Sequence, residues 1–172
     1  MFTTLSYYSL FHTGVSLLPV ALGGYALVRD GKIDPRNWLG KAYLAAMFVS
    51  SVTALRFIAT KGFTPGQGLT LLTLSLLVAG MFAVRRNWRA ADYVETFSLS
   101  TSYFLLWFFT TTEVLTRVPS GHPFASGPTD PALTPVRLVL LVAFVVGLGY
   151  QATQLRTAKT HLFDETQLPH SA

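Results

Sequence analysis

Five stretches of this sequence run without a charged residue for about the thickness of a lipid bilayer. Four of them reach the roughly 17–25 residues that a membrane-spanning helix needs. The stretch that begins at Ala42 also reaches this length if the side chain of Arg56 extends to the membrane surface. The stretches are residues 1–28, 42–55, 62–84, 96–112 and 138–155. The pattern predicts an all-α integral membrane protein built as a bundle of five transmembrane helices.

The expected helices use nearly the whole chain of 172 residues. We place them at residues 7–28, 39–60, 68–84, 94–116 and 132–155. A single membrane domain over residues 1–172 follows, with a proline-rich loop at 118–136 and a tail at 156–172. The first helix has no basic segment before it and no small-residue cleavage site, so we interpret it as a retained helix rather than a signal peptide.

Composition excludes several kinds of site. Charged residues make up 12% of the chain, against about 25% in soluble domains. The absence of cysteine excludes disulfides, thiolate metal ligands and cysteine nucleophiles. The net charge of +5 comes from basic residues in the loops that flank apolar helices, which is typical of membrane proteins and does not indicate nucleic-acid binding. No phosphate-binding glycine loop, G-x-S-x-G or H-E-x-x-H motif is present, so we favour a protein without enzymatic activity.

The basic residues alternate between the gaps and thereby predict an orientation. Nine of the 13 lie in the first gap, the third gap and the tail: Arg29, Lys32, Arg36, Lys41, Arg85, Arg86, Arg89, Arg156 and Lys159. Cytoplasmic loops carry the excess of lysine and arginine. The N-terminus is therefore expected outside, with the C-terminus and the tail 156–172 in the cytoplasm.

The long loop 118–136 contains five of the nine prolines. Proline fixes φ and removes a backbone donor, so neither a helix nor a central strand is expected here. The loop is interpreted as a stiff outer lid, as a partner-binding surface or as a solvated connector. Its candidate contact residues are Pro119, His122, Pro123, Phe124, Pro128, Pro131 and Pro135.

Ionisable residues inside spans are costly and are therefore candidates for function. With the first helix starting outside and the second and fourth running outward, His12, Arg56 and Glu113 fall at a similar depth in the outer leaflet. We expect Arg56 and Glu113 to pair, the alternative being that each extends separately to the outer surface. Glu95, at the start of the fourth span, is interpreted as a complement to the helix dipole.

His12 leaves three interpretations open. It is a structural histidine bonded to a hydroxyl, a haem or metal ligand, or a group that handles protons or contacts a quinone beside Glu113. The chain lacks the stacked pair of intramembrane histidines that membrane b-type cytochromes use. A separate expectation concerns glycines of the first helix, Gly14, Gly23 and Gly24, which permit close approach of another helix or of a ligand.

Several short motifs occur together. They are His12-Thr13-Gly14, Leu39-Gly40-Lys41-Ala42-Tyr43 and Ser102-Tyr103. Over about residues 10–118 the chain thereby resembles a family of small bacterial inner-membrane proteins whose function is unknown. The resemblance implies the same architecture and a location in the bacterial inner membrane. Family members often carry further histidines where this chain has Arg36-Asn37 and residues 92–95, so only His12 is carried over as a cofactor ligand.

Three classes of function remain, and we favour the first. It is a non-catalytic integral membrane subunit or accessory protein within a larger membrane complex. The second is a membrane redox, quinone-site or haem-binding protein that uses His12, Arg56 and Glu113, and the third is a small transporter. The lipid bilayer and other membrane subunits, or further copies of this chain, are the expected partners. No cofactor is the favoured expectation, with quinone or haem left open.

Overall fold

The fold is helical throughout the residues that the structure, a computed structural model, describes: 7–56, 62–86, 88, 90–117 and 122–167. These residues form five α-helices and no strand. The helices are α1 (Tyr7–Asp30), α2 (Trp38–Leu55), α4 (Pro65–Val84), α5 (Ala91–Arg117) and α6 (Thr134–Gln167), and a short 3-10 helix, η1 (Pro131–Leu133), precedes α6.

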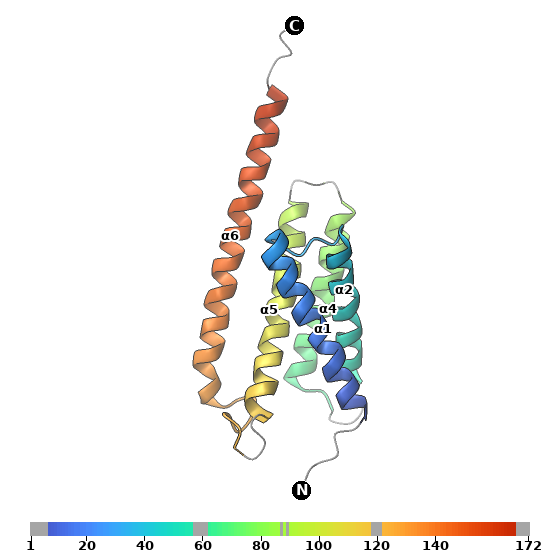
Figure 1. Ribbon diagram of the computed structural model, residues 1–172, viewed down its shortest axis with the longest axis vertical. Helices are drawn as coiled ribbons and strands as arrows, with labels where there is room; N and C mark the ends of the chain where they lie inside the picture. The colour runs from blue at the N-terminus through green and yellow to red at the C-terminus, as the bar shows by residue number, and fades with distance from the viewer. Residues whose placement is uncertain (1–6, 57–61, 87, 89, 118–121, 168–172) are drawn as a thin grey trace.

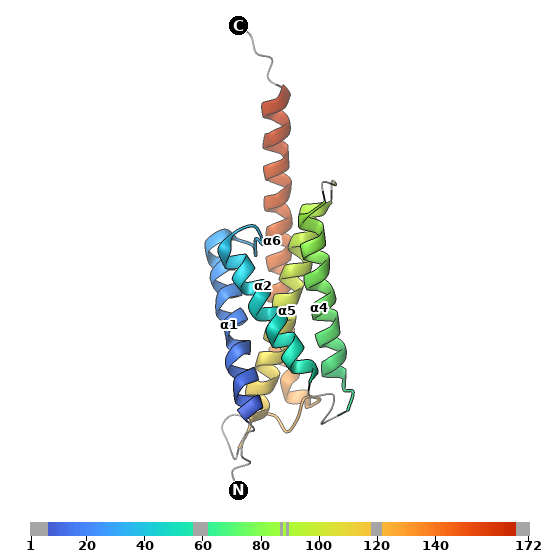
Figure 2. The ribbon, with the colours of Figure 1, turned by 90° about the vertical axis from the view of Figure 1, so that its right-hand side faces the viewer.

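Successive helices run antiparallel, so α1 begins and α6 ends at opposite ends of the molecule (Figure 1). The helices α1, α2, α4 and α5 form a four-helix bundle (Figure 2), and α6 packs on its α5 side (Figure 1). We call one end of the bundle the His12 end, where α1 begins and α5 ends. The opposite end, where α5 begins, is the Glu95 end.

Within the described ranges, four helices are long and apolar enough to cross a membrane, as expected of a multi-pass membrane protein. The spans are Phe11–Asp30, Trp38–Leu55, Pro65–Val84 and Pro131–Thr157. They correspond to four of the five predicted spans. The remaining helix, α5, is less apolar because serine and threonine interrupt its apolar residues.

The polar side chains of α5 are nevertheless paired or enclosed. Thr96, Ser98, Ser100 and Ser102 are buried in the bundle. Four other hydroxyls of α5 donate to carbonyls of the preceding helical turn: those of Thr101, Thr111, Thr112 and Thr116. Such back-bonding lets a hydroxyl-rich helix lie in apolar surroundings without unsatisfied donors.

The centre of the bundle is a junction of two tyrosines. The hydroxyl of Tyr43, which is fully buried, lies 2.8 Å from that of Ser102. The hydroxyl of Tyr103 donates to the carbonyl of Val20 at 3.1 Å, and its ring meets Tyr43 edge-on with the centroids 6.2 Å apart. Residues of the Leu39–Tyr43 and Ser102-Tyr103 motifs thus meet in the core, which indicates that these motifs serve packing.

Two glycines of α1 admit this junction, as the sequence predicted. A Cβ at Gly23 would lie 2.5 Å from Cδ2 of Tyr103 and 3.0 Å from Cε2 of Tyr43, and one at Gly24 would lie 2.9 Å from the Tyr103 hydroxyl. At Gly14 a Cβ would meet nothing within 4 Å, so no described part of the chain approaches this glycine closely.

Helix boundaries differ from the prediction where local capping decides them. Helix α4 begins at Pro65 rather than at residue 68, because Thr64 and Gln67 form a capping box and proline suits the first helical turn. Helix α6 continues to Gln167, well past the predicted end at residue 155, so much of the expected tail is helical. The predicted end of the second helix, at residue 60, lies outside the described residues.

The glycine contacts give a matched pair of substitutions. Gly23→Ala should lower the free energy of unfolding by about 1–3 kcal/mol, because Tyr103 is held by its hydroxyl and cannot retreat from the added methyl group. Gly14→Ala on the same helix should be neutral or stabilising, since its methyl group meets open space and alanine favours the helix. Unfolding with SDS in mixed micelles, followed by circular dichroism, measures both. Equal stability of the two variants would contradict the close packing at Gly23.

Candidate functional site

His12 lies in a polar seam between α1 and α2. Its Nδ1 is 2.8 Å from the hydroxyl of Thr53, and one turn further along α1 the hydroxyl of Ser16 is 2.7 Å from that of Ser50. The hydroxyl of Ser16 also donates to the carbonyl of His12 at 2.7 Å. A hydroxyl partner for His12 was one of the three interpretations of the sequence, and Thr53 of α2 is that partner.

Glu113 lies near the end of α5, at the same end of the bundle as His12. Its carboxylate pairs with Arg117 on the next turn of α5, with Nη2 2.6 Å from Oε2. The side chains are 57% and 53% exposed. The sequence assigned Arg56 as the partner of Glu113. Arg56 caps the C-terminus of α2, where its backbone N–H donates to the carbonyl of Ala54.

The proline-rich loop is folded against the His12 end. Asp130 caps η1: its carboxylate accepts from the N–H of Ala132 at 2.9 Å and from the N–H and the hydroxyl of Ser126, both at 2.7 Å. The Ser126 hydroxyl, then these backbone N–H groups, lower the pKa of Asp130 to about 2. Ala125 and Leu133 are buried and anchor the loop.

The predicted contact residues of this loop lie on its surface. His122, Pro123, Phe124, Pro128, Pro131 and Pro135 are all exposed, whereas Pro119 lies outside the described residues. The guanidinium of Arg137, at the start of α6, donates to the carbonyl of Pro128 and lies 4.9 Å from the ring centroid of Phe108. The described part of the loop is therefore folded and held by hydrogen bonds, and it presents the predicted contact residues at the surface.

The Glu95 end holds a buried carboxylate that the sequence did not identify as a site. The side chain of Glu95 is 1% exposed. Its Oε1 accepts from Nη1 of Arg36 at 2.8 Å and lies 4.0 Å from Nζ of Lys32. Its Oε2 has no hydrogen-bond partner among the described residues. The bond to Glu95 raises the pKa of Arg36, so the guanidinium stays charged.

The conformation of the loop between α1 and α2 places these cations beside Glu95. Asn37 caps α2 by accepting from the N–H of Gly40 at 2.8 Å, and Asp34 accepts from the N–H of Arg36 at 2.9 Å. Gly40 is required because a Cβ there would overlap the carbonyl of Asp34. Ile33 is buried at 1% exposure and fixes the loop to the bundle. Glu95 thereby links α5 to the loop.

The interpretation of Glu95 as a complement to the helix dipole missed this ion pair. A usable signal was present in the sequence: the predicted topology places the first basic loop and the start of the fourth span on one side of the membrane. A carboxylate there faces a loop with Lys32 and Arg36. Which cation reaches it depends on the loop conformation, which the charge pattern does not encode.

Helix α6 is attached to the bundle by a small set of contacts. The rings of Phe104 and Phe144 stack with centroids 4.6 Å apart. Gln151 accepts from the hydroxyl of Ser100 at 2.7 Å and donates to the carbonyl of Gly31 at 2.9 Å. Only 6% of the apolar window of α6 is buried, against 33% in α2 and α4. Most of α6 is therefore available to lipid or to another protein.

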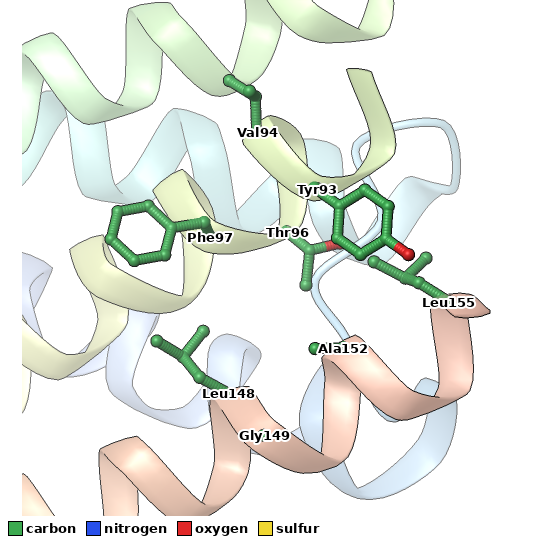
Figure 3. A pocket seen from close by; sticks show the side chains of 8 residues that line it. All are labelled: Tyr93, Val94, Thr96, Phe97, Leu148, Gly149, Ala152 and Leu155. Carbon is green, nitrogen blue, oxygen red and sulfur yellow. The ribbon is translucent and has the colours of Figure 1, made fainter. Parts of the chain in front are cut away.

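Two cavities flank the contact between α5 and α6. One, of about 460 Å³, is lined by Tyr103, Trp107 and Phe144 among others and reaches α1 at Leu27. The other, of about 520 Å³, lies nearer the Glu95 end and is lined by Tyr93, Val94, Thr96, Phe97, Leu148, Gly149, Ala152 and Leu155 (Figure 3). Neither is lined by His12 or Glu113.

The described residues offer apolar cavities and no candidate metal centre. Among the described residues no group of three or more histidine, aspartate and glutamate side chains could hold a metal ion. The two cavities are lined mainly by apolar and aromatic side chains, which suit an apolar molecule or a helix. Comparisons of the chain with family models, with curated proteins and with solved structures found no match.

The two glutamates of α5 should respond differently to neutralisation. Glu95→Gln should destabilise the protein by about 1–3 kcal/mol, because a hydrogen bond between charged groups at a buried site is weakened. Glu113→Gln should cost about 0.5 kcal/mol or less, since an exposed i,i+4 pair contributes little. SDS unfolding of both variants in the same micelles provides the comparison. A larger loss of stability for Glu113→Gln than for Glu95→Gln would show that the carboxylate that stabilises the fold lies at the His12 end.

Proposed function

We propose that this chain is a five-span protein of the bacterial inner membrane that serves as a non-catalytic subunit or accessory protein in a larger membrane complex. In this proposal α5 is the fifth span. It lies between α4 and α6, both apolar enough to cross a membrane, and its hydroxyls are enclosed or bonded to its own carbonyls. A helix flanked by two spans shares their surroundings.

The observation that carries the subunit role is the exposure of α6. This helix contains the most apolar of the four spans, yet 6% of that window is buried. Its outward residues include Val139, Val142 and Val146, which are 61–68% exposed. A helix packed mainly on one neighbour gains little packing energy within its own chain, and packing is what drives association of helices in membranes. A second membrane protein seated on α6 supplies the missing contacts.

The alternatives rest on the His12 end. A redox or haem-binding role uses His12, Glu113 and Arg56, and the contact of His12 with Thr53 is compatible with a structural role for this imidazole. A Soret band in the spectrum of the purified protein would replace the subunit proposal with a haem protein. A transporter role needs a polar path, and the described cavities are mainly apolar.

Site-specific photo-crosslinking tests the subunit role. A benzophenone amino acid replaces Val146 on α6 or, as a matched control, Val78 on α4; both valines are 65% exposed. In intact cells the probe at Val146 should give one discrete protein adduct, identified by mass spectrometry and recovered in fixed ratio to the chain after mild solubilisation. The probe at Val78 should label lipid alone. Identical lipid labelling at both positions would exclude a protein on α6. An adduct of twice the chain mass identifies a second copy.

The orientation is tested separately with topology reporters. The excess of basic residues at the Glu95 end predicts that this end is cytoplasmic. A reporter fused after Ala172 should be active in the cytoplasm, and one inserted near Gly127 in the exposed loop should be active outside. A reporter after Ala172 that is active only outside would reverse the proposed topology.

A further inference from the structure

The cavity between α5 and α6 at the Glu95 end contains a buried hydroxyl with no partner. Thr96 is 4% exposed and lines the cavity, and its Oγ1 has no hydrogen-bond partner among the described residues. Thr101 and Thr112 on the same helix instead donate to their own helical carbonyls. A buried donor without a partner is costly, so an oxygen from another molecule is the expected acceptor.

The other residues that line the cavity indicate the shape of the molecule that binds there. The cavity follows the seam between the two helices, with Phe97 across from Leu148 at one end and Tyr93 beside Leu155 at the other (Figure 3). The Phe97 end is apolar. The Tyr93 end lies near the last residues of the α6 span, which ends at Thr157, and tyrosine is typical of the membrane–water interface. The occupant therefore has an apolar chain and a polar end, with an acceptor oxygen between them.

Charge at the same end favours an anionic polar end. Arg156 is exposed and follows Leu155, which lines the cavity, and Arg85 and Arg86 are exposed where α4 ends, at the same end of the bundle. Basic residues at the membrane surface attract anionic lipid headgroups. A glycerophospholipid has all the required parts: acyl chains, ester carbonyls that accept hydrogen bonds, and a phosphate at the surface.

We propose that this cavity binds a phospholipid of the leaflet at the Glu95 end. One acyl chain lies between Phe97 and Leu148, an ester carbonyl accepts the hydrogen bond of Thr96, and the headgroup lies beside Tyr93 and Arg156. The lipid fills the gap on one side of α6 and fastens this helix to α5. The proposal requires a chain within a membrane, as proposed above, but no protein partner, so the crosslinking result at Val146 and the lipid result are independent.

Two glycines of α6 allow the cavity to be closed without disturbing the fold. A Cβ at Gly149 or at Gly147 meets nothing within 4 Å. Gly149 lines the proposed lipid site, whereas Gly147 lines the cavity toward α1. Gly149→Leu therefore fills the lipid site, and Gly147→Leu is a matched control on the same helix with the same gain in helix propensity.

The experiment is native mass spectrometry of the delipidated full chain in detergent, titrated with a diester phosphatidylglycerol or with its diether analogue, which lacks the ester carbonyls. The diester should bind about threefold to tenfold more tightly, the range of one net hydrogen bond. Thr96→Val, which keeps the shape of the side chain, should abolish this preference. Gly149→Leu should weaken binding of both lipids at least tenfold, and Gly147→Leu should leave both unchanged.

Three results would overturn the proposal. They are equal binding of diester and diether by the unaltered chain, a diester preference that survives Thr96→Val, and unchanged binding by Gly149→Leu. A further titration uses a ubiquinone, which has carbonyl acceptors and an apolar chain but no phosphate. Tighter binding of the quinone than of phosphatidylglycerol would assign the site to a quinone instead. Circular dichroism of each variant confirms that its helices are intact.

Discussion

The need to pair polar groups in apolar surroundings governs this fold, and α5 is where that need is greatest. The helix carries two glutamates and a run of hydroxyls, so it cannot face lipid over its whole circumference. The bundle places it between α4 and α6, with α1 also in contact. Two of its buried hydroxyls meet partners from other helices: that of Ser102 meets Tyr43, and that of Ser100 meets Gln151. The three more uniformly apolar helices α1, α2 and α4 complete the bundle around it.

The two ends of the bundle differ in whether their carboxylate is buried or exposed. At the Glu95 end a carboxylate that is 1% exposed is held by cations of the loop between α1 and α2. At the His12 end Glu113 is 57% exposed and pairs along its own helix. A solvated pair contributes little, whereas a buried carboxylate depends on its partners. The Glu95 end is thus the end at which the elements are bonded to one another: Gly31 connects the loop to α6, and Arg36 connects the loop to α5.

The sequence predicts the helices well because charge and hydropathy decide which segments can lie in a membrane. It also predicts that His12 and Glu113 lie at the same end of the bundle, which follows from the directions of the helices alone. It assigns partners poorly. Glu113 pairs with Arg117 and not with Arg56 as predicted, and His12 meets Thr53 on α2, because partner choice depends on how each helix is rotated about its axis. That rotation is set by contacts such as Tyr103 on Gly23, which no charge pattern encodes.

The attachment of α6 differs in kind from the packing of the other helices. Tyr43 and Tyr103 fill the space between α1, α2 and α5 so closely that Gly23 has no room for a methyl group, whereas Gly147 and Gly149 of α6 face open space. Protein interiors are normally close-packed, and an open seam forfeits dispersion contacts along its length. In a membrane such a seam is filled by lipid chains or by another helix. The aromatic stack of Phe104 on Phe144 and the hydrogen bonds of Gln151 fix the position of α6. The seam on either side of these contacts stays open to lipid chains or to another helix.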